Sequence, residues 1–208
     1  MALLELVVFD CDGVMFDSRD ANRMYYNHLL ETFGYPLMDG EEEEYVHSHN
    51  VFDSVAHIFR KYPGSIDPAH EYREALDYTP YLQYMRIEPD LKEFLQFLKP
   101  RFHTAISTNR STTMPAIMKM HDLEPYFDLV VTALDVQRPK PHAEALQKIL
   151  HHFGLAADQA VYIGDSSVDR EHAAGVNMRL IAFRNQQLEA DYHVNSFRDI
   201  RSLPIFDE

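Results

Sequence analysis

Two aspartates and a glycine follow directly on a run of apolar residues near the N-terminus. Residues 7–18 read VVFDCDGVMFDS, so one residue separates Asp10 from Asp12, and Gly13 comes next. In an extended chain, alternate side chains share a side, which places the two carboxylates together and Cys11 opposite them. Two carboxylates this close ionise together only beside a cation, so the pair indicates a bound metal or one raised pKa. An acidic turn without a ligand is the alternative, because Asp and Gly both favour turns.

A second apolar run ends in the segment AISTNRS, which places Thr108 and Asn109 at its end. A hydroxyl, an amide and several backbone N–H groups lead from there toward a predicted helix, an arrangement that can bind an anion. Simple capping of that helix by Ser111 or Thr113 is the alternative. Capping alone, however, does not require Thr108 and Asn109.

The third candidate is Lys140 in the segment RPKPHAEAL, where Pro139 and Pro141 stiffen the backbone on either side. A lysine ammonium is a compact point charge suited to neutralising an anion. An exposed loop lysine without a function is the alternative. The flanking prolines and the helix predicted to follow favour a functional lysine.

The fourth candidate is the segment VYIGDSSVD, in which apolar residues lead to Asp165 and Asp169 follows four positions later. At that spacing the two carboxylates face one direction if a helix starts here. They are hard oxygen ligands of the kind a divalent cation prefers. A capping aspartate with a second aspartate facing the helix dipole is the alternative.

The elements that would position these residues alternate between strands and helices. Short apolar runs at 5–10, 103–108, 128–132, 160–164 and 179–183 are typical of strands buried on both faces. PDLKEFLQFLK and HAEALQKILHHFG carry apolar stripes at helical spacing. The alternation predicts an α/β fold with a Rossmann-like parallel sheet flanked by helices, in which ligands gather at the carboxyl ends of the strands.

Residues 16–85 show helical patterns and no convincing strand. From Asp17 to Met85 the chain has 13 Asp and Glu against 5 Lys and Arg. We interpret residues 16–85 as an all-helical cap domain inserted into an α/β core of residues 1–15 and 86–208. The run EEEE at 41–44 is most simply an exposed helix start, since acidic residues suit the helix dipole there.

Composition narrows the class of protein. The 208 residues are 46% hydrophobic and 25% charged, as in ordinary folded domains, and no apolar run reaches the ~20 residues that span a bilayer. The 19 basic and 33 acidic residues give a formal charge of −14, which repels nucleic acid and anionic membranes. One cysteine excludes an internal disulfide, which suits a reducing compartment. We expect a cytoplasmic monomer or homodimer that acts on a small molecule.

The four segments together resemble the motifs of the haloacid dehalogenase superfamily, in the branch whose helical cap follows the first motif. The motifs DCDGV, STN, KPHAEAL and GDSSVD occur in the family's order and the resemblance covers the whole chain. Within the family, phosphoglycolate phosphatase and β-phosphoglucomutase are similar in layout. One departure is Asn177, which stands where relatives usually have a glycine in a left-handed turn, and Asn tolerates that conformation.

The resemblance implies a Mg²⁺-dependent phosphatase that hydrolyses a small phosphomonoester through an aspartyl-phosphate. Asp10 would be the nucleophile, and Asp12 the general acid and then the base. The carboxylates of Asp10 and Asp165 and the backbone carbonyl of Asp12 would bind Mg²⁺. Asp169 would support the metal or orient Lys140. The substrate-binding residues would be Thr108, Asn109 and Lys140, with Lys140 also offsetting the negative charge.

Two other functions stay open. A phosphosugar mutase would use the same motifs but return the phosphoryl group to the substrate. A non-catalytic binding protein would keep the fold, although such proteins usually lose a motif residue and none is lost here. Asp12 favours phosphate esters, because a leaving alkoxide needs a proton and a leaving halide does not.

Overall fold

The chain forms two units. The computed structural model describes residues 3–49 and 51–206. One unit comprises Met1–Asp17 and Ile87–Glu208, and the other comprises Ser18–Arg86. We call them the α/β unit and the helical unit. The insertion therefore interrupts the α/β unit shortly after Asp10 and Asp12.

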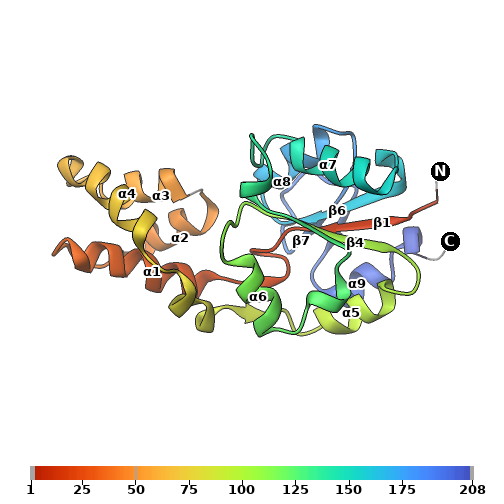
Figure 1. The fold of residues 1–208 in the computed structure, drawn as a ribbon, viewed down its shortest axis with the longest axis horizontal. Coiled ribbons are helices and arrows are strands. Elements are labelled where there is room, and N and C mark those ends of the chain that lie inside the picture. The colour runs from red at the N-terminus through yellow and green to blue at the C-terminus, as the bar shows by residue number, and fades with distance from the viewer. Residues whose placement is uncertain (1–2, 50, 207–208) are drawn as a thin grey trace. The chain divides into compact units, whose positions relative to one another are not determined.

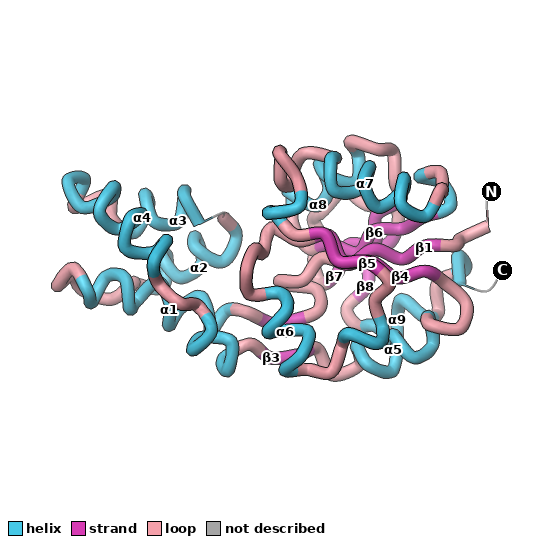
Figure 2. The backbone as a smooth tube through the Cα atoms, viewed as in Figure 1, coloured by secondary structure: helices cyan, strands magenta, loops and turns pink. Residues whose placement is uncertain are grey.

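Six strands of the α/β unit form one parallel sheet in the order β5-β4-β1-β6-β7-β8 (Figures 1 and 2). Phe9 at the end of the central strand β1 is level with Ile106 of β4 and Ile163 of β6. The predicted parallel α/β sheet is confirmed, and five of these strands lie within predicted apolar runs. The sixth, β8, was not predicted. The strand bounds are β1 Leu6–Phe9, β4 His103–Ser107, β5 Leu129–Val131, β6 Ala160–Gly164, β7 Arg179–Phe183 and β8 Tyr192–Val194.

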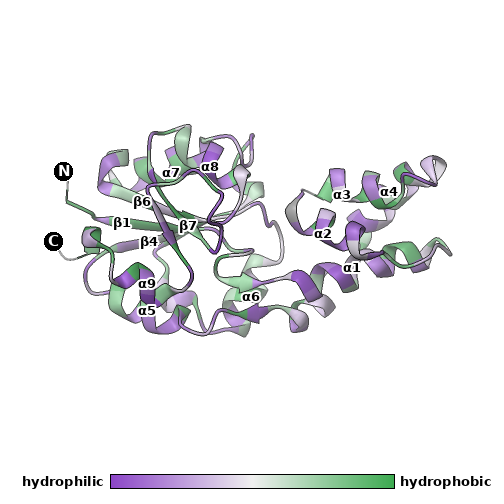
Figure 3. Ribbon diagram, turned by 180° about the vertical axis from the view of Figure 1, so that it is seen from behind, coloured by the Kyte–Doolittle hydropathy of each residue, from purple (hydrophilic) through white to green (hydrophobic). Residues whose placement is uncertain are grey.

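Helices cover both faces of this sheet (Figure 1). On one face, Leu146 and Ile149 share a buried apolar cluster with Val8. On the other face, the ring centroid of Phe9 lies 6.1 Å from that of Phe94 and 6.2 Å from that of Phe197. The strands between the helices are apolar (Figure 3), as expected for strands buried on both sides. The helices are α5 Leu91–Leu98, α6 Met114–Met120, α7 Glu144–Phe153, α8 Ser167–Ala174 and α9 Phe197–Arg201.

Two turns have the left-handed geometry that their residues allow. Gly154 follows α7 with φ of 68°, and Asn177 follows α8 with φ of 56°. The prediction that Asn177 lies in a left-handed turn is confirmed. Strand β7 then begins two residues later.

The helical unit has its own core, in which rings and aliphatic side chains such as Tyr25, Leu29 and Phe59 are buried together. The run EEEE lies at the start of an α-helix, as predicted, but it is not exposed throughout, because Glu42 is buried and forms a capping box with Asp39. The helices are α1 Arg19–Thr32, α2 Gly40–Ser48, α3 Val51–Ile58 and α4 Ile66–Ala75.

Short elements complete the chain. Strands β2 Phe16–Asp17 and β3 Arg86–Ile87 pair with each other where the chain leaves and re-enters the α/β unit. Among the described residues, no helix is both long and apolar enough to cross a bilayer. Short 3-10 helices occur at Pro63–Ser65, Thr79–Tyr84, Glu124–Tyr126, Ala133–Asp135, Ala157–Gln159 and Pro204–Phe206.

Candidate active site

The predicted site residues of the α/β unit meet at the carboxyl ends of its central strands. Asp10 directly follows β1, and its backbone N–H donates to Ile163 O at 2.9 Å. Thr108 follows β4 and is held by a bond from its N–H to Val131 O at 3.1 Å. Asp165 follows β6. The parallel register therefore brings three of the four motifs to one edge of the sheet.

Lys140 joins the third motif to the first and the fourth. Its Nζ lies 2.7 Å from Asp10 Oδ1, 2.8 Å from Asp169 Oδ1 and 3.0 Å from the Tyr162 hydroxyl. The side chain is only 4% exposed, so these three contacts occupy the three N–H groups of the ammonium. Burial alone would lower the pKa of Lys140, but Asp10 and Asp169 outweigh it and raise the pKa above its usual value. The lysine is therefore a permanent, fixed cation beside Asp10.

The carboxylates at this edge differ sharply in pKa. Burial raises the pKa of Asp10 to about 7 against the opposing effect of Lys140, and it raises the pKa of Asp165 to about 8 with help from the charges of Asp169 and Asp10. Burial would also raise the pKa of Asp169, but Lys140 and the hydrogen bonds that the carboxylate accepts lower it overall. The positive charges of the protein itself therefore do not bring the pKa values of Asp10 and Asp165 down to the usual range.

The site fits a divalent cation. Oxygen atoms of Asp10, Asp165 and Asp169 all lie within 4.8 Å of one another. Asp169 Oδ1 already accepts from Lys140 and Tyr162, and its Oδ2 accepts from Ser166 Oγ at 2.7 Å and from two backbone N–H groups. Asp10 and Asp165 are therefore the carboxylates that suit a metal as direct ligands, and Asp169 is occupied with orienting Lys140.

Gly13 allows the first motif to approach the fourth closely. Its φ is 77°, and a Cβ at this position would lie 2.0 Å from Asp165 Oδ2. Only glycine combines that backbone conformation with that approach. The first motif therefore needs its glycine for contact with Asp165 as well as for the turn. The Cys11 side chain is buried.

Asp12 is held by an arginine that sequence reasoning did not single out. Arg110 Nε and Nη2 donate to the two carboxylate oxygens of Asp12 at 2.7 and 2.6 Å, so the pair is bidentate. Arg110 directly follows the STN motif, which is the only signal that the sequence offered. The carboxylate of Asp12 is not part of the three-carboxylate cluster.

Thr108 and Asn109 have different local roles. Thr108 is buried, and its Oγ1 accepts from the backbone N–H of Arg110 at 3.1 Å, which leaves its hydroxyl proton for another acceptor. The side chain of Asn109 donates to the backbone oxygen of Lys140 at 3.0 Å. Asn109 thus ties the second motif to the loop that carries Lys140.

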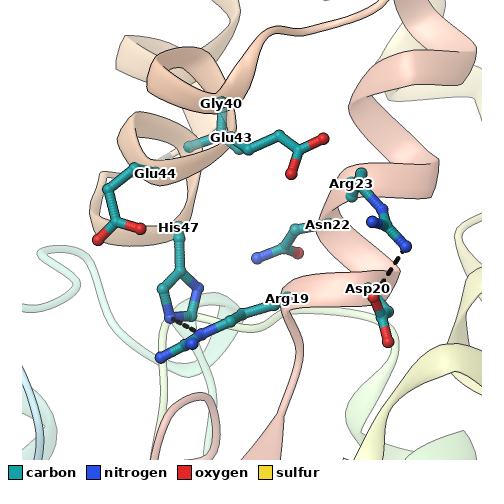
Figure 4. A pocket seen from close by; sticks show the side chains of 9 residues that line it. Arg19, Asp20, Asn22, Arg23, Gly40, Glu43, Glu44 and His47 are labelled. Carbon is teal, nitrogen blue, oxygen red and sulfur yellow. Dashed lines mark hydrogen bonds and ion pairs between the residues drawn. The ribbon is translucent and has the colours of Figure 1, made fainter.

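The helical unit carries a pocket of about 250 Å³ between α1 and α2 (Figure 4). Arg19 Nε donates to His47 Nε2 at 3.1 Å, and Arg23 forms an ion pair with Asp20 at 2.9 Å (Figure 4). His47 therefore lines a polar pocket. Both acidic and basic side chains line this pocket, so its charge is mixed.

The comparisons place the chain in a family. Residues 7–183 match the family described as haloacid dehalogenase-like hydrolase. A solved HAD-superfamily hydrolase of subfamily IA, variant 1, from Geobacter sulfurreducens is 36% identical, with a TM-score of 0.82 over 95% of this chain and 94% of that one.

Two relatives carry phosphatase names. Pyrophosphatase PpaX of Bacillus cereus is 27% identical over 176 residues, which are 80% of this chain and 76% of the relative. The phosphorylated carbohydrates phosphatase of Thermotoga maritima is 24% identical over 190 residues, 83% of this chain and 82% of the relative. The family resemblance of the four motifs is confirmed, and the chain belongs to the haloacid dehalogenase-like hydrolase family of enzymes.

Proposed function

We propose that this enzyme is a Mg²⁺-dependent phosphatase that hydrolyses a small phosphomonoester through an aspartyl-phosphate on Asp10. The observation that carries the proposal is the buried contact between Asp10 and Lys140, with the carboxyl of Asp165 beside it. A buried carboxylate held by a fixed cation at a sheet edge is placed to attack an electrophile. The phosphatase names of the relatives support phosphorus as that electrophile.

In this mechanism Asp10 attacks phosphorus and the ester oxygen leaves. Since Oδ1 of Asp10 contacts Lys140, Oδ2 is the attacking atom. The ammonium of Lys140 offsets negative charge on Asp10 and on the phosphoryl oxygens. The Thr108 hydroxyl and the backbone N–H of Asn109 donate to the phosphoryl oxygens and orient the group.

Asp12 moves the protons. It protonates the leaving oxygen and then takes a proton from the water that hydrolyses the aspartyl-phosphate. The bidentate contact with Arg110 orients the carboxylate of Asp12. When Asp12 carries the proton for the acid step, it gives up part of this contact.

Mg²⁺ would be held by the carboxylates of Asp10 and Asp165 and by the backbone carbonyl of Asp12. Bound there, it would neutralise the charge of the carboxylates and of the phosphate. Asp169 would not bind Mg²⁺ directly. Its carboxylate contacts Lys140 Nζ, and together with Ser166 it forms the capping box of α8. The raised pKa values of Asp10 and Asp165 are what an acidic site shows when only the protein's own charges act on it.

These pKa values predict how Mg²⁺ stabilises the protein. Without metal, the native state binds more protons than the unfolded state between the usual pKa of 3.8 and the raised values of about 7 and about 8. The free energy of unfolding contributed by Asp10 and Asp165 therefore falls as the pH rises through this range. Mg²⁺ at a concentration ~100 times its Kd adds about 2.7 kcal/mol to the free energy of unfolding and so offsets this loss.

We expect thermal unfolding to show a larger Mg²⁺-induced rise in Tm at a pH near 8 than at a pH near 5, since Mg²⁺ needs the ionised carboxylates. The variant Asp165→Asn should lose most of the rise at the higher pH. An equal rise at both values would contradict this assignment of the metal site.

The chain is strongly acidic, with a formal charge of −14, and this bears on the substrate. Residues 17–85 carry 13 acidic and 5 basic side chains, which disfavours strongly anionic substrates. Of the substrates in the relatives' names, a phosphorylated carbohydrate therefore fits better than pyrophosphate when it carries a single phosphate. A sugar bisphosphate is expected to be turned over poorly.

A panel of phosphorylated metabolites tests the proposed function. Purified protein with Mg²⁺ should release phosphate from at least one monoester, and excess chelator should abolish the release. Including pyrophosphate and a sugar bisphosphate tests the charge argument, and efficient turnover of either would refute it. A hexose 1-phosphate that yields an isomerised sugar phosphate without free phosphate would identify a mutase instead.

A further inference from the structure

His172 is a buried histidine that joins the segments around the candidate active site. It lies on α8, three residues after Asp169, and its side chain is fully buried. Its Nδ1 is 2.6 Å from the backbone oxygen of His142, and its Nε2 is 2.9 Å from Ser107 Oγ. The edge of the ring meets Tyr162, with centroids 5.5 Å apart. Every polar atom of this imidazole therefore has a protein partner.

The partners determine where the protons lie. A carbonyl oxygen only accepts, so Nδ1 of His172 must carry the hydrogen that His142 O receives. Nε2 then has a lone pair and accepts from the hydroxyl of Ser107. Burial, together with the charge of Lys140, lowers the pKa of His172 to about 4, so the ring is neutral near pH 7. The geometry and the protonation state agree.

Each partner lies within two positions in the sequence of a residue that takes part in the proposed mechanism. His142 is two residues from Lys140, whose own backbone oxygen is held by Asn109. The loop is therefore held by side chains on both sides of Pro141. Ser107 directly precedes Thr108, and it is bonded a second time through its backbone oxygen, which accepts from Tyr162 at 3.2 Å.

The same network reaches the ammonium of Lys140. The hydroxyl of Tyr162 that donates toward Ser107 O and Asp169 also accepts from Lys140 Nζ. Ser107 is thus linked to Lys140 through Tyr162, and to the Lys140 loop through His172. An apolar side chain at position 172 would leave both the Ser107 hydroxyl and the His142 carbonyl without this partner.

We propose that His172 is a positioning residue that sets the Lys140 loop and the Thr108 end of β4 relative to Asp10, an inference that rests on the proposed phosphatase function. It acts through Ser107 and His142 and touches no reacting atom. A small displacement of a positioned charge in an active site costs a large part of the rate, up to ~100-fold for about 1 Å.

Three variants separate the two hydrogen bonds. In His172→Asn the shorter amide keeps a donor near the Nδ1 position for His142 O and loses the acceptor for Ser107. Ser107→Ala removes the same Ser107 bond from the other side with little change in volume. Each is expected to lower kcat/KM for a phosphomonoester about 10-fold, and His172→Ala, which loses both bonds, about 100-fold. The double variant His172→Asn with Ser107→Ala should be no worse than the more damaging single variant.

Binding of inorganic phosphate gives a second readout. With Mg²⁺ present, calorimetry should show the Kd for phosphate rising about 10-fold in Ser107→Ala and in His172→Asn, in step with kcat/KM. Ile149→Val is the matched control, because it removes a methylene from the buried core on α7 and touches none of these groups. It should lower Tm and leave both kcat/KM and the phosphate Kd unchanged at temperatures well below Tm.

The inference is overturned if folded Ser107→Ala and His172→Asn keep wild-type kcat/KM and phosphate Kd, or if Ile149→Val changes both as much as they do. Ser107→Ala keeps the test valid even if His172→Ala fails to fold. A wild-type protein that releases no phosphate from any monoester and binds none would instead refute the proposed function, which is a separate result.

Discussion

Asp10→Asn is expected to lower phosphate release on the order of 10⁴-fold or more, the range observed when a covalent nucleophile is removed from an enzyme. The amide keeps the size of the carboxylate but cannot form an acyl phosphate at a useful rate. Steady-state phosphate release measured at saturating Mg²⁺ checks the prediction.

Asp158→Asn is the control for this variant, because the same substitution falls on an exposed aspartate of the α/β unit. It should leave kcat/KM unchanged. Circular dichroism and thermal unfolding should show Asp10→Asn to be folded. If the folded Asp10→Asn variant releases phosphate at the wild-type rate, the covalent mechanism is wrong.

Lys140→Met is the second substitution with a large expected effect. The lysine is 4% exposed and contacts Asp10 and Asp169, so its removal leaves two buried carboxylates without their cation. Breaking a buried ion pair from one side costs about 3–5 kcal/mol of stability. Losing a preorganised charge at the phosphoryl group costs about 10²–10³-fold in kcat.

The two effects of Lys140→Met are measured separately, by denaturant unfolding and by kcat at a temperature where the variant is folded. Lys148→Met on α7 is the matched control, since Lys148 is exposed and its Nζ donates to the backbone oxygen of Asp135 at 3.0 Å. It should change neither quantity appreciably. A Lys140→Met variant with wild-type kcat would show that Lys140 stabilises the fold and takes no part in the reaction.

The sequence predicted the framework of the site because the framework depends on local patterns. Short apolar runs bounded by polar residues indicate buried parallel strands, and such strands bring their carboxyl ends together. Asp10, Thr108 and Asp165 therefore meet as expected. The left-handed turn at Asn177 was predicted from the family resemblance, and its φ of 56° confirms it.

The partners of these residues were not predictable, because they depend on tertiary packing. Tyr162 lies in an apolar strand and was interpreted only as part of that strand, yet its hydroxyl bonds Lys140 and Asp169. Arg110 and His172 are single polar residues whose partners lie 98 and 65 positions away in the chain. No periodicity in one sequence connects such distant pairs. For Asp169 the sequence left two roles open, and its distances support orientation of Lys140.

The most direct test of the account is to detect the aspartyl-phosphate itself. We expect Asp12→Asn, which lacks the acid for the first step and the base for the second, to accumulate the intermediate from an aryl phosphate whose phenolate leaves without protonation, when the two are mixed with Mg²⁺ and quenched in acid. Mass spectrometry of the digest should then find one phosphoryl group on the peptide that contains Asp10, and none in the Asp10→Asn variant. Single-turnover phosphate release by the wild type with no phosphorylated Asp10 in any quenched sample would contradict the account.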